Sequence, residues 1–155
     1  MAIRLLIGAA DQDSLELYAI LLDSALRLLP LDVVARYVRG RQEITERVTA
    51  GETDVLLLDW SVANADTVDY VRGLLAADRR LRTIIAMPSH MRQYRTCLWE
   101  AGACVGLPTE HLDQEWLLSM LCLITRAMER EDRAALAPAK PAPDGPDALR
   151  EASER

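Results

Sequence analysis

The chain has 155 residues, of which 50% are hydrophobic and 27% are charged, so one folded domain with a substantial core is expected. Its formal net charge of −6 argues against sequence-independent binding to nucleic acid, because contact with phosphates requires a basic surface. No apolar stretch approaches the ~18 residues of a membrane span, and the apolar run near the N-terminus is too short for a signal peptide. We therefore expect a cytoplasmic protein without a membrane segment.

The cysteines also limit the function classes. Cys97, Cys104 and Cys122 are scattered, and no Cys-x-x-Cys or His-rich tract accompanies them. A structural zinc site normally needs such closely spaced ligands, so the sequence predicts no metal site of this kind. Three unpaired thiols are typical of a reducing, intracellular environment.

Short apolar runs alternate with helical patterns along the chain. The first run, residues 3–7, predicts a buried strand, and Asp13 with Glu16 three residues later predicts the start of a helix that Pro30 ends. A short second strand begins at residues 32–34. The later elements are expected as strands at 54–59, 83–87 and 104–107 and as helices at 41–50, 67–77, 89–101 and 113–135.

Five strands that alternate with five helices predict an α/β fold, a doubly wound parallel sheet covered on both faces. In such a sheet the functional crevice lies at the carboxyl ends of the strands. We assign residues 1–136 to this domain. Residues 137–155 contain four of the seven prolines and no aromatic residue, and we expect them to form a disordered tail.

Two segments carry a resemblance to a known family. The sequence TDVLLLDW at 53–60 resembles the third strand of response-regulator receiver (CheY-like) domains, and EAGACVGLP at 100–108 resembles their segment from the fourth helix into the fifth strand. The similarity covers about residues 3–130. It implies a five-stranded sheet of order 2-1-3-4-5, a role in signal transduction, and a partner such as a histidine kinase or another signalling protein. It also makes Asp59 the residue that matches the phosphoacceptor.

The sequence departs from the family pattern at most positions that the chemistry needs. A working receiver holds Mg²⁺ with clustered carboxylates and neutralises the phosphoryl group with a lysine. Here the acidic pair falls on alanines, and the hydroxyl, switch-aromatic and lysine positions are also replaced; the five positions are Ala9, Ala10, Met87, Gly106 and Thr109. The only lysine in the chain is Lys140, in the tail. We therefore expect no cofactor and no functional Mg²⁺ site.

Two interpretations of Asp59 stay open. It either accepts a phosphoryl group without the usual support, or it is a residual carboxylate that caps a neighbouring loop, which we favour. Asp11 and Asp13 follow the missing acidic pair closely. We expect Asp13 to cap the first helix and Asp11 to face water.

The fourth and fifth helices carry the features that suggest binding. Tyr94, Cys97, Leu98 and Ala101 are expected to form the core stripe of the fourth helix, while Trp99 lies on its opposite face beside Arg92 and Arg95. This combination is typical of a binding hot spot, although an exposed tryptophan folded over its neighbours is an equally good interpretation. The fifth helix is apolar beyond one stripe, and the residues that extend it are Trp116, Met120 and Leu123. We expect a homodimer or a protein partner on the face that the fourth helix, fifth strand and fifth helix form.

Three functions follow from these patterns. The first is an atypical receiver, or pseudo-receiver, that acts in signalling by phosphorylation-independent protein–protein interaction. The second is a phosphorelay receiver that accepts a phosphoryl group on Asp59. The third is a small enzyme on a flavodoxin-like sheet, which no acid–base pair, nucleophile or phosphate loop supports. We therefore expect the chain not to be an enzyme.

Overall fold

Five parallel strands form one sheet in the computed structural model, which describes residues 2–139 of the chain. The strands are β1 Ile3–Ala9, β2 Val33–Arg39, β3 Val55–Asp59, β4 Arg82–Met87 and β5 Val105–Pro108. Their order is β2-β1-β3-β4-β5, and every neighbouring pair is parallel. The predicted fold class and strand order are confirmed.

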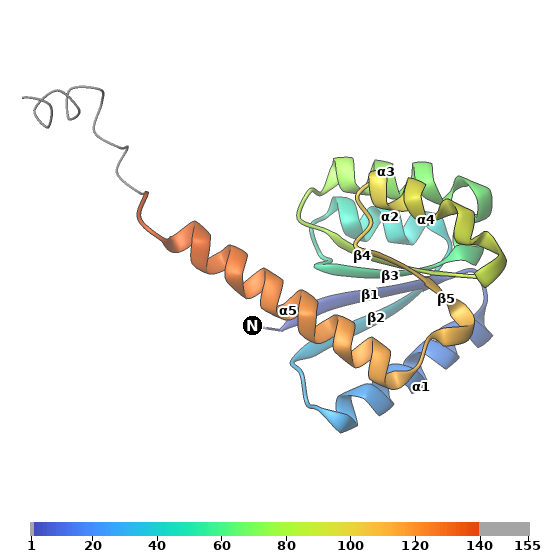
Figure 1. Cartoon of the computed structure of the whole chain (residues 1–155), viewed down its shortest axis with the longest axis horizontal. Helices are drawn as coiled ribbons and strands as arrows, with labels where there is room; N and C mark the ends of the chain where they lie inside the picture. Colours follow the sequence, from blue (N-terminus) through green and yellow to red (C-terminus); the bar gives the residue numbers. More distant parts are fainter. Residues whose placement is uncertain (1, 140–155) are drawn as a thin grey trace, which may run out of the picture. The chain divides into compact units, whose positions relative to one another are not determined.

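Five α-helices connect and cover the strands. They are α1 Gln12–Leu28, α2 Arg41–Thr49, α3 Thr67–Ala77, α4 Arg95–Glu100 and α5 Gln114–Leu136. Helices α2, α3 and α4 cover one face of the sheet, and α1 with the first part of α5 covers the other (Figure 1). All five residues of β3 are buried, which is why this strand reads as a continuous apolar run in the sequence.

The chain divides into two units, Met1–Thr125 and Arg126–Arg155. The first unit contains the whole sheet and α5 as far as Thr125. Of the second unit the structure describes residues 126–139, which continue α5 to Leu136. Residues 140–155 of the predicted tail lie outside the described residues. None of the helices in residues 2–139 is long and apolar enough to cross a membrane.

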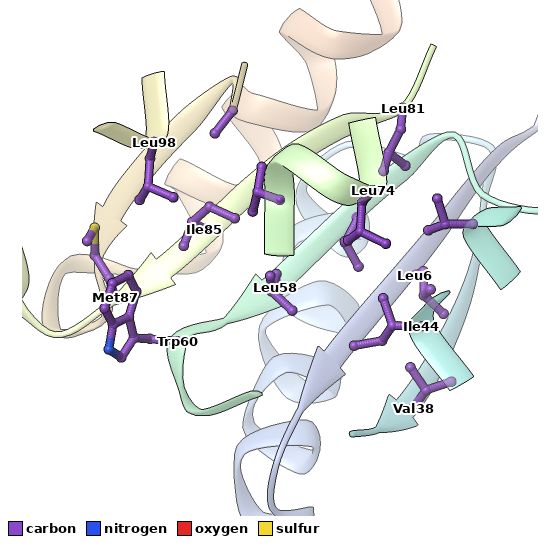
Figure 2. Close-up of a cluster of buried hydrophobic side chains, with 14 residues drawn as sticks. Leu6, Val38, Ile44, Leu58, Trp60, Leu74, Leu81, Ile85, Met87 and Leu98 are labelled. Carbon is purple, nitrogen blue, oxygen red and sulfur yellow. The ribbon is translucent and has the colours of Figure 1, made fainter. Parts of the chain in front are cut away.

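A hydrophobic cluster lies between the sheet and helices α2, α3 and α4 (Figure 2). Leu6, Leu58 and Ile85 come from the sheet, and Ile44 and Leu98 come from the covering helices. Gly8 allows α2 to approach the sheet closely, because a Cβ atom at this position would collide with the buried side chain of Ile44. Gly8 is therefore a packing residue.

The structure corrects three local predictions. Asp11, and not Asp13, is the N-cap of α1: its carboxylate accepts a 2.7 Å hydrogen bond from the Ser14 backbone N–H. The segment before α4 is a 3₁₀ helix, Ser89–Tyr94, so the regular α-helix begins at Arg95. Cys97 is exposed and does not belong to the core stripe of α4. A shorter α-helix presents fewer turns to the sheet, and Leu98 is its one buried residue.

Candidate functional site

The carboxyl ends of the central strands bring several predicted site residues to one edge of the sheet. Gly8 pairs with Leu58, so Ala9 of β1 lies level with Asp59 of β3. Asp59 pairs in turn with Ala86, and Met87 follows on β4. The positions that the resemblance assigns to the metal ligands, the phosphoacceptor and the hydroxyl are therefore neighbours in space.

The carboxylate of Asp59 has a protein donor for each of its oxygens. Oδ1 accepts a 2.9 Å hydrogen bond from the Ser61 backbone N–H, which makes Asp59 the N-cap of the short 3₁₀ helix Trp60–Val62. Oδ2 accepts a hydrogen bond from the Tyr18 hydroxyl of α1. Both side chains are shielded from solvent, with Asp59 at 9% and Tyr18 at 1% relative exposure.

The Tyr18 phenol is a neutral donor to this carboxylate. Burial, together with the hydrogen bond to Asp59 and its charge, raises the pKa of Tyr18 far above its ordinary value. The phenol therefore keeps its proton at every physiological pH. A buried tyrosine hydroxyl needs an acceptor, and Asp59 provides it.

Ser61, which follows β3, is hydrogen-bonded to the chain just after β1. Its hydroxyl accepts a 3.1 Å hydrogen bond from the Ala10 backbone N–H. Ala9 is completely buried, whereas Ala10 is exposed. At the two positions where the family carries acids, this chain therefore contributes methyl groups and one backbone donor.

The remaining replaced positions serve packing and loop structure. Met87 is 1% exposed and lies with Trp60 at one end of the core cluster (Figure 2). Thr109 begins a 3₁₀ turn at the end of β5, and it is followed by Glu110, whose carboxylate accepts hydrogen bonds of 3.2–3.3 Å from the Ser89 backbone N–H. Hydrogen bonds from its own backbone and from Ser89 lower the pKa of Glu110. This contact joins the loops that follow β4 and β5.

The residues at this edge do not fit a Mg²⁺ ion. Mg²⁺ requires several oxygen ligands in near-octahedral geometry. Asp11 is the first acid that follows Ala9 and Ala10 in the sequence. Its carboxylate caps α1, however, and the hydrogen bonds from Ser14 lower its pKa. Within residues 2–139 no group of three or more His, Cys, Asp or Glu side chains is placed to share a metal ion.

The predicted interaction residues lie on the 3₁₀ helix Ser89–Tyr94, on α4 and on α5. Trp99 is 71% exposed and Leu123 is 59% exposed, while Trp116 and Met120 are partly buried. Arg92 and Arg95 are both exposed. Trp99 and Arg95 border the same groove beside β5.

Sequence reasoning missed Tyr18 and Ser61 as partners of Asp59. Tyr18 lies on the buried stripe of α1 with Leu15, Leu22 and Ala25, and periodicity indicates only that it is buried. The available signal was its hydroxyl: a tyrosine among leucines and alanines on a buried stripe must find an acceptor, and the acids at the carboxyl ends of the strands are natural candidates. Ser61 gave no comparable signal, because serine is common after a strand.

Comparison with known proteins identifies the fold. No family model matches the chain, and no curated protein matches it. Among solved structures, the chain is similar to a receiver domain from Methanospirillum hungatei, with 14% identity over 84% of this chain and 99% of the other and a TM-score of 0.69. It is also similar to the receiver domain of a DNA-binding response regulator from Colwellia psychrerythraea, with 13% identity over 80% and 98% and a TM-score of 0.67.

A third similar structure has a different description. It is a Burkholderia pseudomallei protein described as related to pilus assembly, with 20% identity over 79% of this chain and 88% of the other and a TM-score of 0.66. At these identities the likeness is one of fold. The chain has the fold of response-regulator receiver domains over most of its length.

Proposed function

From this fold we propose that the chain is a pseudo-receiver, a signalling module that binds a protein partner and does not depend on phosphorylation. Its contact surface is the α4–β5–α5 face, and the partner is a second copy, a histidine kinase or another signalling protein. The proposed module is not an enzyme, holds no cofactor and acts in the cytoplasm.

The hydrogen bond from Tyr18 to Asp59 is the observation that carries the proposal. A carboxylate oxygen that attacks a phosphodonor must be accessible, but Oδ2 of Asp59 is buried against the phenol and Oδ1 holds the Ser61 N–H. Phosphoryl transfer would also place further negative charge beside Asp59. In the described part of the chain, no lysine or arginine side chain forms an ion pair or hydrogen bond with Asp59.

The alternative is a phosphorelay receiver that accepts a phosphoryl group on Asp59. Incubating the purified protein with Mg²⁺ and acetyl phosphate, followed by intact mass measurement, separates the two functions. We expect no phosphate-sized mass increase. An increase that disappears in Asp59→Asn but persists in the matched carboxylate variant Asp54→Asn would overturn the proposal in favour of the alternative.

A Mg²⁺ titration tests the cofactor part of the proposal independently. Trp60 follows Asp59 directly and is 5% exposed, so its fluorescence reports on changes at this edge. We expect no saturable change at millimolar Mg²⁺, because the acidic pair is replaced by Ala9 and Ala10. A sub-millimolar transition that Asp59→Asn abolishes would contradict this expectation.

A further inference from the structure

The outer edge of β2 carries backbone hydrogen-bonding groups that no other described strand uses. In the part of the chain that the structure describes, β2 is an end strand of the sheet and pairs only with β1 (Figure 1). The Asp32 carbonyl and the Gly40 N–H both bond to β1, at 2.8 and 3.3 Å. Backbone groups of successive residues point to opposite sides of a strand, so those of the odd-numbered residues from Val33 to Arg39 point outward. This edge can therefore accept a further strand.

Apolar side chains are exposed on both faces of β2. Val34 is 51% exposed and Tyr37 is 39% exposed, and the alternation of a strand places them on opposite faces. Edge strands are usually protected by charged residues or proline, because an apolar edge pairs with other chains. The charged residues of β2 are Arg36 and Arg39. The edge thus combines free backbone groups, apolar surface on each face and positive charge.

A cavity of about 430 Å³ opens beside this edge, on the face of the sheet that α2 covers. Leu6 and Val34 line it from the sheet, while Arg47 and Thr53 line it from α2 and the loop that follows. Arg36 also borders the cavity, and it lies two residues from Val34 on the same face of β2. The cavity therefore offers an apolar surface next to a guanidinium group.

Arg36 is the unpaired cation of this cavity. Arg4 forms an ion pair with Asp54 at 2.7 Å. Arg47 forms an ion pair with Glu52 at 3.2 Å. Within residues 2–139, Arg36 is exposed and forms neither an ion pair nor a hydrogen bond. A carboxylate from another molecule can pair with this guanidinium without displacing a partner.

We propose that the edge of β2 binds an extended acidic segment of a partner protein as an added strand. The outward-pointing backbone groups of β2 hold the segment by hydrogen bonds. One carboxylate of the segment pairs with Arg36, and an apolar side chain two residues away enters the cavity beside Val34. The inference goes beyond the proposed function, because β2 and β5 are at opposite ends of the strand order and this site lies outside the α4–β5–α5 face.

A second copy of the chain is a poor occupant of this edge. A two-fold antiparallel pairing centred on β2 would place Arg36 opposite the same residue of the other copy, and like charges directly opposite one another are unfavourable. The same residue attracts a carboxylate, although the whole chain has a net charge of −6. The preference for an acidic partner is therefore local, and an experiment can separate it from the overall charge of the protein.

The test uses the synthetic peptide TVTETVT, which places one glutamate between two valines on the same face of a strand. Its matched control is TVTKTVT, in which lysine replaces the glutamate. Titration of the whole chain, followed by amide NMR, measures both dissociation constants. We expect TVTETVT to bind at least about fivefold more tightly, because its carboxylate pairs with Arg36. Nonspecific attraction to a protein of net charge −6 would favour the lysine peptide instead.

Charge reversal at Arg36 should remove this preference. In Arg36→Glu we expect TVTKTVT to bind at least as tightly as TVTETVT. Arg72→Glu is the matched control, because it makes the same change of charge at an exposed ion pair on α3, and it should keep the wild-type preference. Both positions are exposed, so both variants should fold, which circular dichroism checks.

Backbone pairing is tested on the peptide, so that the protein stays unchanged. N-methylation of alternate residues blocks one edge of TVTETVT and leaves its other edge free, and the two alternate sets give two peptides. One of the two should keep binding, and the other should lose it. In the protein, the amides of Ala35 and Tyr37 should become protected from hydrogen exchange when unmethylated TVTETVT binds.

Three results would overturn the inference. The first is no binding of TVTETVT at peptide concentrations up to about 5 mM. The second is equal affinity of the wild type for TVTETVT and TVTKTVT, which would remove the role of Arg36. The third is equal behaviour of the two N-methylated peptides, which would exclude the addition of a strand.

Discussion

Replacing Tyr18 with phenylalanine removes one hydroxyl from the centre of the candidate site and leaves the ring in place. The Asp59 carboxylate then keeps the Ser61 N–H but loses the donor to Oδ2, in a position where water has little access. A hydrogen bond to a charged group contributes about 1.5–3 kcal/mol, and we expect the free energy of unfolding to fall by that amount at pH 7. For a domain of this size the corresponding fall in Tm is about 3–12 °C.

The effect of Tyr18→Phe should depend on pH in the alkaline range. Burial and the bond to Asp59 raise the pKa of Tyr18 in the folded protein, so its contribution to stability is fully present below the unfolded pKa of about 10. Above that pH the unfolded phenol loses its proton while the folded one keeps it, and stability decreases. At pH 11 the wild type has lost about 1.4 kcal/mol from this residue, so the difference between the two proteins shrinks by that amount.

Urea denaturation at pH 7 and pH 11 measures both effects. Tyr70→Phe is the matched control, because its half-buried hydroxyl bonds to Thr45 and to the Arg41 carbonyl nearer the surface, and it should cost less at pH 7. A double-mutant cycle with Asp59→Asn should give a coupling of at least about 1 kcal/mol between residues 18 and 59. A Tyr18→Phe protein as stable as wild type, with additive effects in the cycle, would refute the reasoning.

Three further predictions follow from other contacts. Gly8→Ala should destabilise the fold by about 1–2 kcal/mol in urea denaturation, because the new methyl group displaces the buried Ile44 from the sheet. Arg4→Met should cost at most about 1 kcal/mol at pH 7, since the Arg4–Asp54 pair is partly exposed. Burial acts to raise the pKa of Asp54, but the hydrogen bonds and charge of Arg4 outweigh it and lower that pKa, so the cost should begin to shrink below pH about 4 and vanish once the pH is below the lowered pKa. Leu123→Glu should weaken self-association in light scattering, whereas Asp59→Ala should leave it unchanged.

The sequence predicts the architecture well because apolar periodicity reports burial directly. The run from Val55 to Asp59 is buried on both faces, and such a strand has to lie inside a parallel sheet. The sequence predicts the first residue of a helix less accurately, because the choice of N-cap decides it. Asp11 and Asp13 are both suitable N-caps, and only the path of the chain after β1 shows that Asp11 accepts the Ser14 N–H.

The sequence indicates which residues lie near the candidate site, but it does not indicate which side chains contact Asp59. The resemblance names Asp59 and the five replaced positions, and the parallel register brings the ends of β1, β3 and β4 together. Periodicity cannot identify the partner of a polar atom on a buried stripe, because that depends on side-chain direction across two elements.

The replaced residues and Tyr18 are parts of one arrangement. A carboxylate at the end of a buried strand must be compensated, and a receiver does so with a metal ion and a lysine. This chain has alanines at the metal positions and no lysine before Lys140, so neutral donors, the Tyr18 hydroxyl and the Ser61 N–H, take over that role. Neutral donors stabilise the single charge of Asp59, but they cannot compensate the added charge of a phosphoryl group. In the proposed function the conformation of this edge therefore does not change with phosphorylation, and the α4–β5–α5 face presents one state to a partner.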